Sequence, residues 1–141
     1  MQNRTATAVW QGNLKDGSGN IVFGNGRFDE PYSAASRFED GKETNPEELI
    51  AAAHAGCYSM ALSHALVKAG HTAKRVETEA TVHMEEDDDG FSITSIDLRT
   101  EGTVPDIEPE TFQTIATFAK DNCPVSKALA ACTIRLVATL V

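Results

Sequence analysis

The sequence has few cysteines and few basic residues. It contains three cysteines, an odd number that is too small for a disulfide-stapled secreted scaffold. Its 12 Lys and Arg residues stand against 21 Asp and Glu, and the net charge of −9 argues against nucleic acid or an anionic membrane surface as a partner. The first residues show no signal-peptide pattern. We therefore expect a cytoplasmic protein with reduced thiols whose partner is a small molecule or another protein.

Charged residues are also absent from one long stretch, residues 49–67. A run of this length has to be considered as a transmembrane helix. Six of its residues are alanine, however, and Gly, Ser and His residues interrupt it. A helix that is apolar nearly all round but built of small residues is typical of the centre of a globular core. We therefore predict a buried helix and no membrane span.

The first third of the chain has the pattern of a small antiparallel sheet. The chain of 141 residues is 41% hydrophobic, and we predict one domain over residues 1–141 with a core of its own. Polar and apolar residues alternate over residues 5–10, and Asp16-Gly17 predicts a turn before a strand at residues 21–23. Residues 31–43 have no clear period and are rich in Ser, Ala and Gly. We predict a loop there.

The start of the long helix has strong signals. Asn45 is the predicted N-cap, Pro46 takes the first helical position, and Glu48 stands where a reciprocal capping residue belongs. Gly70 is the predicted end. The helix then has about 24 residues and a length of about 36 Å, enough to cross a whole domain.

The remaining residues predict two more strands, two helices and a final strand. Residues 76–84 alternate in polarity, a turn follows at residues 87–90, and a strand over residues 91–99 changes phase near Thr94-Ser95, which predicts a bulge. A helix is predicted from Pro109 and a short one from Pro124, before a last strand over residues 132–140. Strands, a helix, strands and helices in this order predict an α+β domain.

Cys57 and Cys123 are the residues most suited to chemistry, because one lies inside the long helix and the other at the start of a short one. Two such thiols suggest a redox couple, although free cysteine most often simply packs. Cys57 lies about three turns inside its helix and gains little from the helix dipole. Cys123 is at an N-cap position, where the thiolate is favoured. On these grounds either thiol can be the nucleophile.

Several alternatives remain open at this stage. His54 precedes Cys57 by one turn, and a His54–Cys57 pair would favour a cysteine hydrolase. A zinc site formed by His54, Cys57 and Cys123 matches no standard ligand spacing. A non-catalytic, stress-related binding domain would need both thiols to be inert. We expect Cys132 to be a buried structural thiol and the acidic run at residues 85–89 to be a solvated turn rather than a metal site.

The segment from Arg37 to Cys57, together with Asn122-Cys123-Pro124-Val125-Ser126, resembles the OsmC/Ohr family, and in particular its osmotically inducible protein C branch. The resemblance implies antiparallel sheets wrapped around a long central helix, in an intertwined homodimer with sites at the interface. It implies a thiol peroxidase that reduces organic hydroperoxides to alcohols in oxidative or osmotic stress defence. Cys57 would be the attacking thiolate, Cys123 the resolving thiol, and Arg37 and Glu47 the other active-site residues. No cofactor or metal is implied, but an external dithiol or lipoyl-type reductant is required.

Glu47 precedes Cys57 by ten residues, which is about 15 Å along a straight helix. The two side chains are therefore too far apart to touch. We expect the site to be completed across a dimer interface or by a loop folded back over the helix, with Glu47 orienting Arg37. Four apolar residues are candidates for a substrate pocket: Phe38, Tyr58, Met60 and Leu62.

Overall fold

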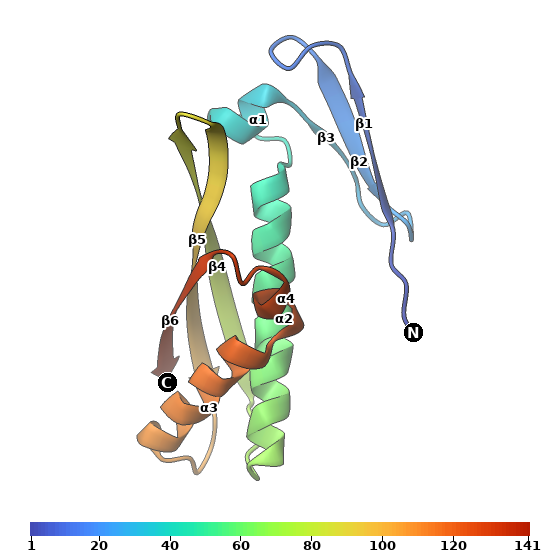
Figure 1. Ribbon diagram of the computed structural model, residues 1–141. Coiled ribbons are helices and arrows are strands. Elements are labelled where there is room, and N and C mark those ends of the chain that lie inside the picture. Colours follow the sequence, from blue (N-terminus) through green and yellow to red (C-terminus); the bar gives the residue numbers. More distant parts are fainter. The chain divides into compact units, whose positions relative to one another are not determined.

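The computed structural model describes all 141 residues, and the chain divides into two compact units, residues 1–49 and residues 50–141. We refer to them as the N-terminal and the C-terminal unit and describe each by itself. Ten elements follow one another along the chain (Figure 1). The prediction of one domain over residues 1–141 stays a prediction.

The N-terminal unit is built on a three-stranded antiparallel sheet, as the alternating pattern predicted. Its strands are β1 (Ala6–Gln11), β2 (Ser18–Phe23) and β3 (Asp29–Tyr32), in the order β1-β2-β3. Gly19 lies opposite Tyr32, and a Cβ there would clash with the tyrosine ring. The sheet buries little apolar surface, because Ile21 is its one buried hydrophobic residue.

The predicted loop at residues 31–43 is wrong in part. It contains the end of β3 and a short helix, α1 (Ala34–Phe38). Ser33 and Ser36 cap this helix reciprocally, since each side-chain oxygen accepts a hydrogen bond from the other residue's backbone N–H. The Ser36 hydroxyl also donates to the Thr44 carbonyl over 2.8 Å. This polar capping carries no hydrophobic period, which is why the pattern of apolar residues missed it.

The long helix α2 (Pro46–Lys68) begins and ends where the sequence predicted. The Asn45 side chain accepts a hydrogen bond from the Glu48 N–H over 2.8 Å, and Gly70 leaves the helix at φ = 91°. By length and composition α2 is apolar enough to cross a membrane, a test that the core helix of a soluble protein also passes. One stripe of it is buried: His54, Tyr58, Leu62 and Leu66.

The C-terminal unit has a second three-stranded sheet, β4 (Arg75–Asp87), β5 (Gly90–Thr103) and β6 (Thr133–Leu140). The predicted bulge is confirmed, because His83 pairs with Ser95 and Met84 with Ile93, which leaves Thr94 unpaired. Strands β4 and β5 are antiparallel, but β5 and β6 are parallel. The expectation of purely antiparallel sheets is therefore wrong for this pair.

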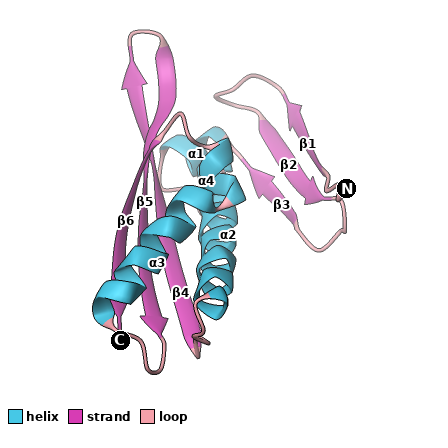
Figure 2. Ribbon diagram, turned by 60° about the horizontal axis from the view of Figure 1, so that its bottom comes forward, coloured by secondary structure: helices cyan, strands magenta, loops and turns pink.

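Two helices connect β5 to β6, as a parallel pair requires. They are α3 (Pro109–Asn122) and α4 (Pro124–Ala128). Both α2 and α3 lie on one face of the sheet (Figure 2), where they bury a shared core. Its largest members come from α2, β5 and α3: Tyr58, Leu62, Leu66, Ile96, Leu98 and Phe112. The α+β class and the long central helix are thus confirmed.

Candidate functional site

The two thiols that the sequence singled out are in contact inside the C-terminal unit. The Sγ atoms of Cys57 and Cys123 lie 3.0 Å apart and share a hydrogen bond, although the residues are 66 positions apart in sequence. Both cysteines are free, Cys123 is fully buried, and Cys57 is half-buried. A covalent S–S bond is about 2.05 Å long. The two sulfurs therefore need to move only a short distance towards each other to form a disulfide.

Local structure explains how Cys123 reaches α2. It is the residue between two helices, ending α3 and starting α4. Its backbone N–H donates to the Ala119 carbonyl over 2.9 Å, and Pro124 then takes the first position of α4. The corner between α3 and α4 therefore holds the side chain against the middle of α2.

The groups of the C-terminal unit favour negative charge on Cys123 rather than on Cys57. Burial by itself raises the pKa of the Cys123 thiol, but hydrogen bonds from the Cys57 thiol, from the backbone and hydroxyl of Ser126 and from the Val125 backbone lower it below the usual value. Burial raises the pKa of Cys57, and the hydrogen bond to Cys123 raises it further. These causes favour the thiolate on Cys123 and the proton on Cys57, as expected from the position of Cys123 at the start of a helix.

His54 does not pair with Cys57. Its Nε2 lies 2.7 Å from the Ser126 hydroxyl oxygen, and both residues are buried. The other ring nitrogen, Nδ1, is buried without a hydrogen-bond partner. Burial lowers the pKa of His54, which keeps the ring neutral at neutral pH. The hydrogen bond that a His54–Cys57 hydrolase would need is therefore replaced by one to Ser126.

Arg37 and Glu47 form an ion pair inside the N-terminal unit. The Nε and one terminal nitrogen of Arg37 both donate to Glu47 Oε1, over 3.1 and 2.9 Å. The Glu47 side chain is only 13% exposed, and its second oxygen is buried without a partner. Arg37 comes from the last turn of α1 and Glu47 from the first turn of α2. The predicted contact, in which Glu47 holds the guanidinium of Arg37, is confirmed.

An apolar hollow of about 410 Å³ adjoins this ion pair within the N-terminal unit. Arg37 is its one charged lining residue, and Trp10 and Tyr32 pack edge to face with ring centroids 5.2 Å apart. The remaining walls are mostly apolar side chains, among them Leu14, Phe38 and Pro46. A hollow of this kind suits an alkyl group attached to a polar head that the guanidinium can bind.

The four candidates for a substrate pocket do not form one together. Phe38 lines the hollow beside Arg37, as expected. Tyr58 and Leu62 are fully buried in the core of the C-terminal unit, and the Tyr58 hydroxyl donates to the Ala116 carbonyl over 3.1 Å. Met60 is 76% exposed. Residues 58, 60 and 62 cannot share one direction, because successive residues of a helix are about 100° apart.

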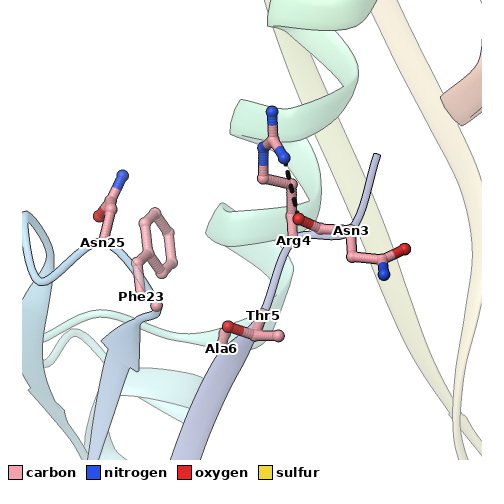
Figure 3. Close-up of a pocket in the computed structure, with 7 residues that line it drawn as sticks. Asn3, Arg4, Thr5, Ala6, Phe23 and Asn25 are labelled. Atoms are coloured by element: carbon pink, nitrogen blue, oxygen red, sulfur yellow. Dashed lines mark hydrogen bonds between the residues drawn. The ribbon is translucent and has the colours of Figure 1, made fainter. Parts of the chain in front are cut away.

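Other hollows offer less chemistry. One of about 550 Å³ lies where β1 begins and β2 ends (Figure 3), and its walls include none of the four predicted site residues. Arg4, its one charged lining residue, donates to the Asn3 carbonyl over 2.9 Å. No group of three or more His, Cys, Asp and Glu side chains is arranged to hold a metal ion. Cys132 is half-buried beside the core, with its Sγ 3.5 Å from the Ile93 carbonyl.

Ser126 is the site residue that the sequence did not assign. It follows Cys123 by three residues, its hydroxyl lies 2.7 Å from His54 Nε2, and a hydrogen bond from its side chain helps to lower the pKa of Cys123. The spacing of three residues, on a helix that begins between the two, was the available signal. It was missed because nothing local in the sequence links α4 to His54.

Comparison with known proteins gives a consistent result. A family model described as "OsmC-like protein" matches residues 39–137. Peroxiredoxin OsmC of Escherichia coli (strain K12) is 45% identical over 130 residues, which are 92% of this chain and 91% of that protein. An organic hydroperoxide resistance protein-like sequence of Staphylococcus aureus (strain USA300) is 35% identical over 92 residues, 63% of this chain and 64% of that protein. The crystal structure of the organic hydroperoxide resistance protein OhrB of Bacillus subtilis superposes with a TM-score of 0.72 at 27% identity, covering 97% of this chain and 98% of that chain.

Proposed function

Since the chain belongs to the OsmC-like family, we propose that it is a cysteine-based peroxidase that reduces organic hydroperoxides to alcohols. Its relatives, a peroxiredoxin and organic hydroperoxide resistance proteins, support a peroxide-related stress function. The observation that carries the proposal is the contact of the Cys57 and Cys123 sulfurs at 3.0 Å.

In the first step, the Cys57 thiolate attacks the outer oxygen of the hydroperoxide. The O–O bond breaks, Cys57 becomes a sulfenic acid, and the departing alkoxide takes a proton and leaves as the alcohol. The thiol has lost two electrons and the peroxide has gained them. In the second step, the Cys123 sulfur attacks Cys57, the S–O bond breaks, and hydroxide leaves as water once it has taken a proton. An external dithiol or lipoyl-type reductant then reduces the disulfide, so no resident cofactor is needed.

Arg37 has two tasks in this proposal. The C-terminal unit on its own keeps the proton on Cys57, so the first step needs a cation from elsewhere to bring negative charge to that sulfur. The guanidinium of Arg37 is a cation that can bind both the thiolate and the developing alkoxide. Glu47 is the positioning residue, because its carboxylate accepts two hydrogen bonds from the guanidinium and fixes its direction.

The hollow beside Arg37 supports an organic rather than an inorganic peroxide. Its aromatic and aliphatic walls can take an alkyl group, while the guanidinium binds the peroxide end. Hydrogen peroxide has no apolar part to place there, so we propose that alkyl or lipid hydroperoxides are the better substrates.

We further propose that the working protein is a cytoplasmic homodimer. A stripe of exposed small and apolar residues along α2 supports this, since such a surface is typical of an interface between copies: Ala52, Ala53, Gly56, Met60 and Val67. The net charge of −9 supports neither nucleic acid nor an anionic membrane as a partner.

Mass spectrometry of peptides tests the peroxidase cycle. Reduced protein is treated with one equivalent of cumene hydroperoxide, thiols are blocked, and the disulfide-linked peptides are identified. We expect a Cys57–Cys123 disulfide in the parent and in Cys132→Ser, and none in Cys57→Ser. If the parent stays reduced while the peroxide persists, the chain has kept the fold without the chemistry and the proposal is wrong.

Mixing two inactive variants tests whether the site is shared between subunits. Arg37→Met and Cys57→Ser chains are coexpressed so that mixed dimers form. If one subunit's Arg37 serves the other's Cys57, random pairing restores about a quarter of the parent activity, because half of the dimers are mixed and each has one intact site. No recovery would show that both residues act within one chain.

A further inference from the structure

The proposed peroxidase steps give no role to one buried series of hydrogen-bonding side chains. It runs from His54 of α2 to Ser126 of α4 and on to Cys123, all within the C-terminal unit. His54 is completely buried, Ser126 is 5% exposed, and His54 Nε2 lies 2.7 Å from the Ser126 oxygen. Ser126 follows Cys123 by three residues on α4, and a hydrogen bond from its side chain is one of the causes that lower the pKa of the Cys123 thiol. Burial of an imidazole costs free energy unless its polar atoms form hydrogen bonds.

We propose that His54 and Ser126 form a donor chain that holds Cys123 as the thiolate for the second step: His54 Nε2–H donates to the Ser126 oxygen, and the Ser126 O–H donates to the Cys123 sulfur. This inference rests on the proposed peroxidase function and adds two residues to it. Ser126 touches the reacting sulfur, whereas His54 is a positioning residue that acts through Ser126.

The unpartnered nitrogen of His54 fixes the direction of the chain. A neutral imidazole carries one proton, on either Nδ1 or Nε2. Nδ1 has no hydrogen-bond partner, so a proton on Nδ1 would be a buried donor without an acceptor. In that tautomer the Ser126 O–H would have to donate to Nε2 and could not donate to the sulfur. With the proton on Nε2, Ser126 receives a hydrogen bond and its single O–H is free for the sulfur. The second arrangement makes one more hydrogen bond and leaves only a lone pair unpaired.

The surroundings of His54 keep this arrangement over a wide pH range. Cys57 and Tyr58 follow His54 by about one turn on its own helix, and Cys123, at the corner of α3 and α4, is in contact with Cys57. Burial is the one cause that moves the pKa of His54, and it moves it down. Charged side chains contribute nothing to that shift. The ring therefore remains a neutral donor at neutral pH.

The chain matters only in the second step. There the Cys123 thiolate attacks the sulfenic sulfur of Cys57, the S–S bond forms, the S–O bond breaks, and the hydroxide released takes one proton from solvent. Hydrogen bonds to a thiolate lower its pKa and raise the fraction that is ionised at neutral pH. Loss of the chain should therefore slow disulfide closure without slowing the attack on peroxide.

Rapid-quench kinetics at several pH values test the proposal on the full-length protein. Reduced protein is mixed with one equivalent of cumene hydroperoxide, and two products are followed by mass spectrometry: dimedone-trapped Cys57 sulfenic acid and the Cys57–Cys123 disulfide. For Ser126→Ala and His54→Leu we expect the sulfenic acid at the parent rate, but disulfide closure about tenfold slower at pH 7, with its midpoint moved up by about one pH unit. At pH 9.5 the variants should match the parent.

Three controls make the test specific. Ser126→Thr keeps the hydroxyl and His54→Gln keeps an N–H donor, so each should restore most of the closure rate at pH 7. His64→Leu changes an exposed histidine on the same helix and should behave as the parent does. These variants also cover the case in which His54→Leu fails to fold.

Each outcome separates the donor chain from the peroxidase cycle. If the parent forms no sulfenic acid, the proposed function itself fails. If sulfenic acid forms but Ser126→Ala closes the disulfide at the parent rate at every pH, the donor chain is wrong. A loss of closure that is equal at all pH values would also overturn it, because misplaced packing, unlike a raised thiol pKa, is not corrected by alkali.

Discussion

The two units differ sharply in the number of apolar side chains that each one buries. The N-terminal unit buries a single apolar side chain, Ile21, whereas the C-terminal unit buries ten. The thiol pair lies in the well-packed unit and the Arg37–Glu47 ion pair in the thinly packed one. Two sulfurs need fixed neighbours if they are to meet reproducibly, and dense packing supplies them. The guanidinium of Arg37, for which we propose a role in binding the substrate, has a hollow beside it instead.

The largest expected effect falls on the well-packed unit. Cys57→Ser should lower the rate of cumene hydroperoxide consumption by about 1,000-fold or more, because the hydroxyl is a far weaker nucleophile than a thiolate. Cys132→Ser, a change to the other half-buried cysteine of the unit, should leave the rate unchanged. Equal losses in the two variants would mean that packing, not nucleophilic attack, is what the cysteines provide.

The next effect falls on the thinly packed unit. Arg37→Met should lower the rate constant for peroxide attack at pH 7 by about 100-fold, and the midpoint of its pH profile should rise, because Arg37 is the cation that we propose for the Cys57 thiolate. Glu47→Gln should cost about tenfold, since the guanidinium is kept but less well directed. The measurement is the second-order rate constant between pH 5 and 10.

Arg27→Met is the matched control, because Arg27 is an exposed arginine of the same unit. It should react as the parent does. An unchanged pH profile in Arg37→Met would contradict the role given to this residue, even if the rate fell.

Stability should reflect the same difference between the units. Leu62→Ala removes a fully buried side chain and should lower the free energy of unfolding by about 2–5 kcal/mol. Ile21→Ala, in the N-terminal sheet, should lower the free energy of unfolding by no more than about 2 kcal/mol. Fewer side chains surround Ile21, so its removal leaves a smaller cavity. Urea unfolding followed by circular dichroism measures both. Similar losses would show that Ile21 belongs to a larger core than its own unit provides.

The smallest effect concerns the outer face of the C-terminal sheet. Asp97 accepts hydrogen bonds from Arg135 over 2.5 Å and from His83 over 2.7 Å, and these lower its pKa from 3.8 to about 2. A carboxyl whose pKa is lowered by folding adds stability above its unfolded pKa and loses it as the pH falls towards the folded value. The stabilisation should therefore be present above about pH 4 and disappear by about pH 2.

Asp97→Asn tests this by removing the titrating group. The difference in urea midpoint between parent and variant should shrink as the pH is lowered from 5 to 2. A constant difference across that range would show that the carboxylate adds nothing through its charge. The exposure of the group keeps the expected change small.

Local signals predicted most of the elements correctly. The Asn45 cap, the change of phase at Thr94 and the alternating strands each depend on a few residues that are neighbours in sequence. Each of these features is found in the structure. The short helix α1 was missed because its capping by Ser33 and Ser36 is polar and carries no period. The parallel pairing of β5 with β6 was missed because alternation predicts a strand but not its partner.

The same difference between neighbouring and distant residues applies to the candidate site. Neither the 3.0 Å contact of Cys57 with Cys123 nor the bond of His54 to Ser126 follows from spacing, since each joins residues more than 60 positions apart. The sequence singled out the two thiols, and the resemblance to a family assigned their roles and added Arg37 and Glu47. It assigned nothing to Ser126, and only the packing of α4 against α2 brings that residue to His54.

The parallel crossover also sets the order in which the protein matures. Strand β6 can join the sheet only after α3 and α4 have been synthesised, because the segment between β5 and β6 runs through both helices. Pairings between such distant segments form slowly. During synthesis Cys57 leaves the ribosome 66 residues ahead of Cys123. A newly made chain therefore passes through a stage in which Cys57 lacks the thiol that we propose as its resolving partner, and oxidation at that moment would carry Cys57 past the sulfenic acid to forms that thiols do not reverse.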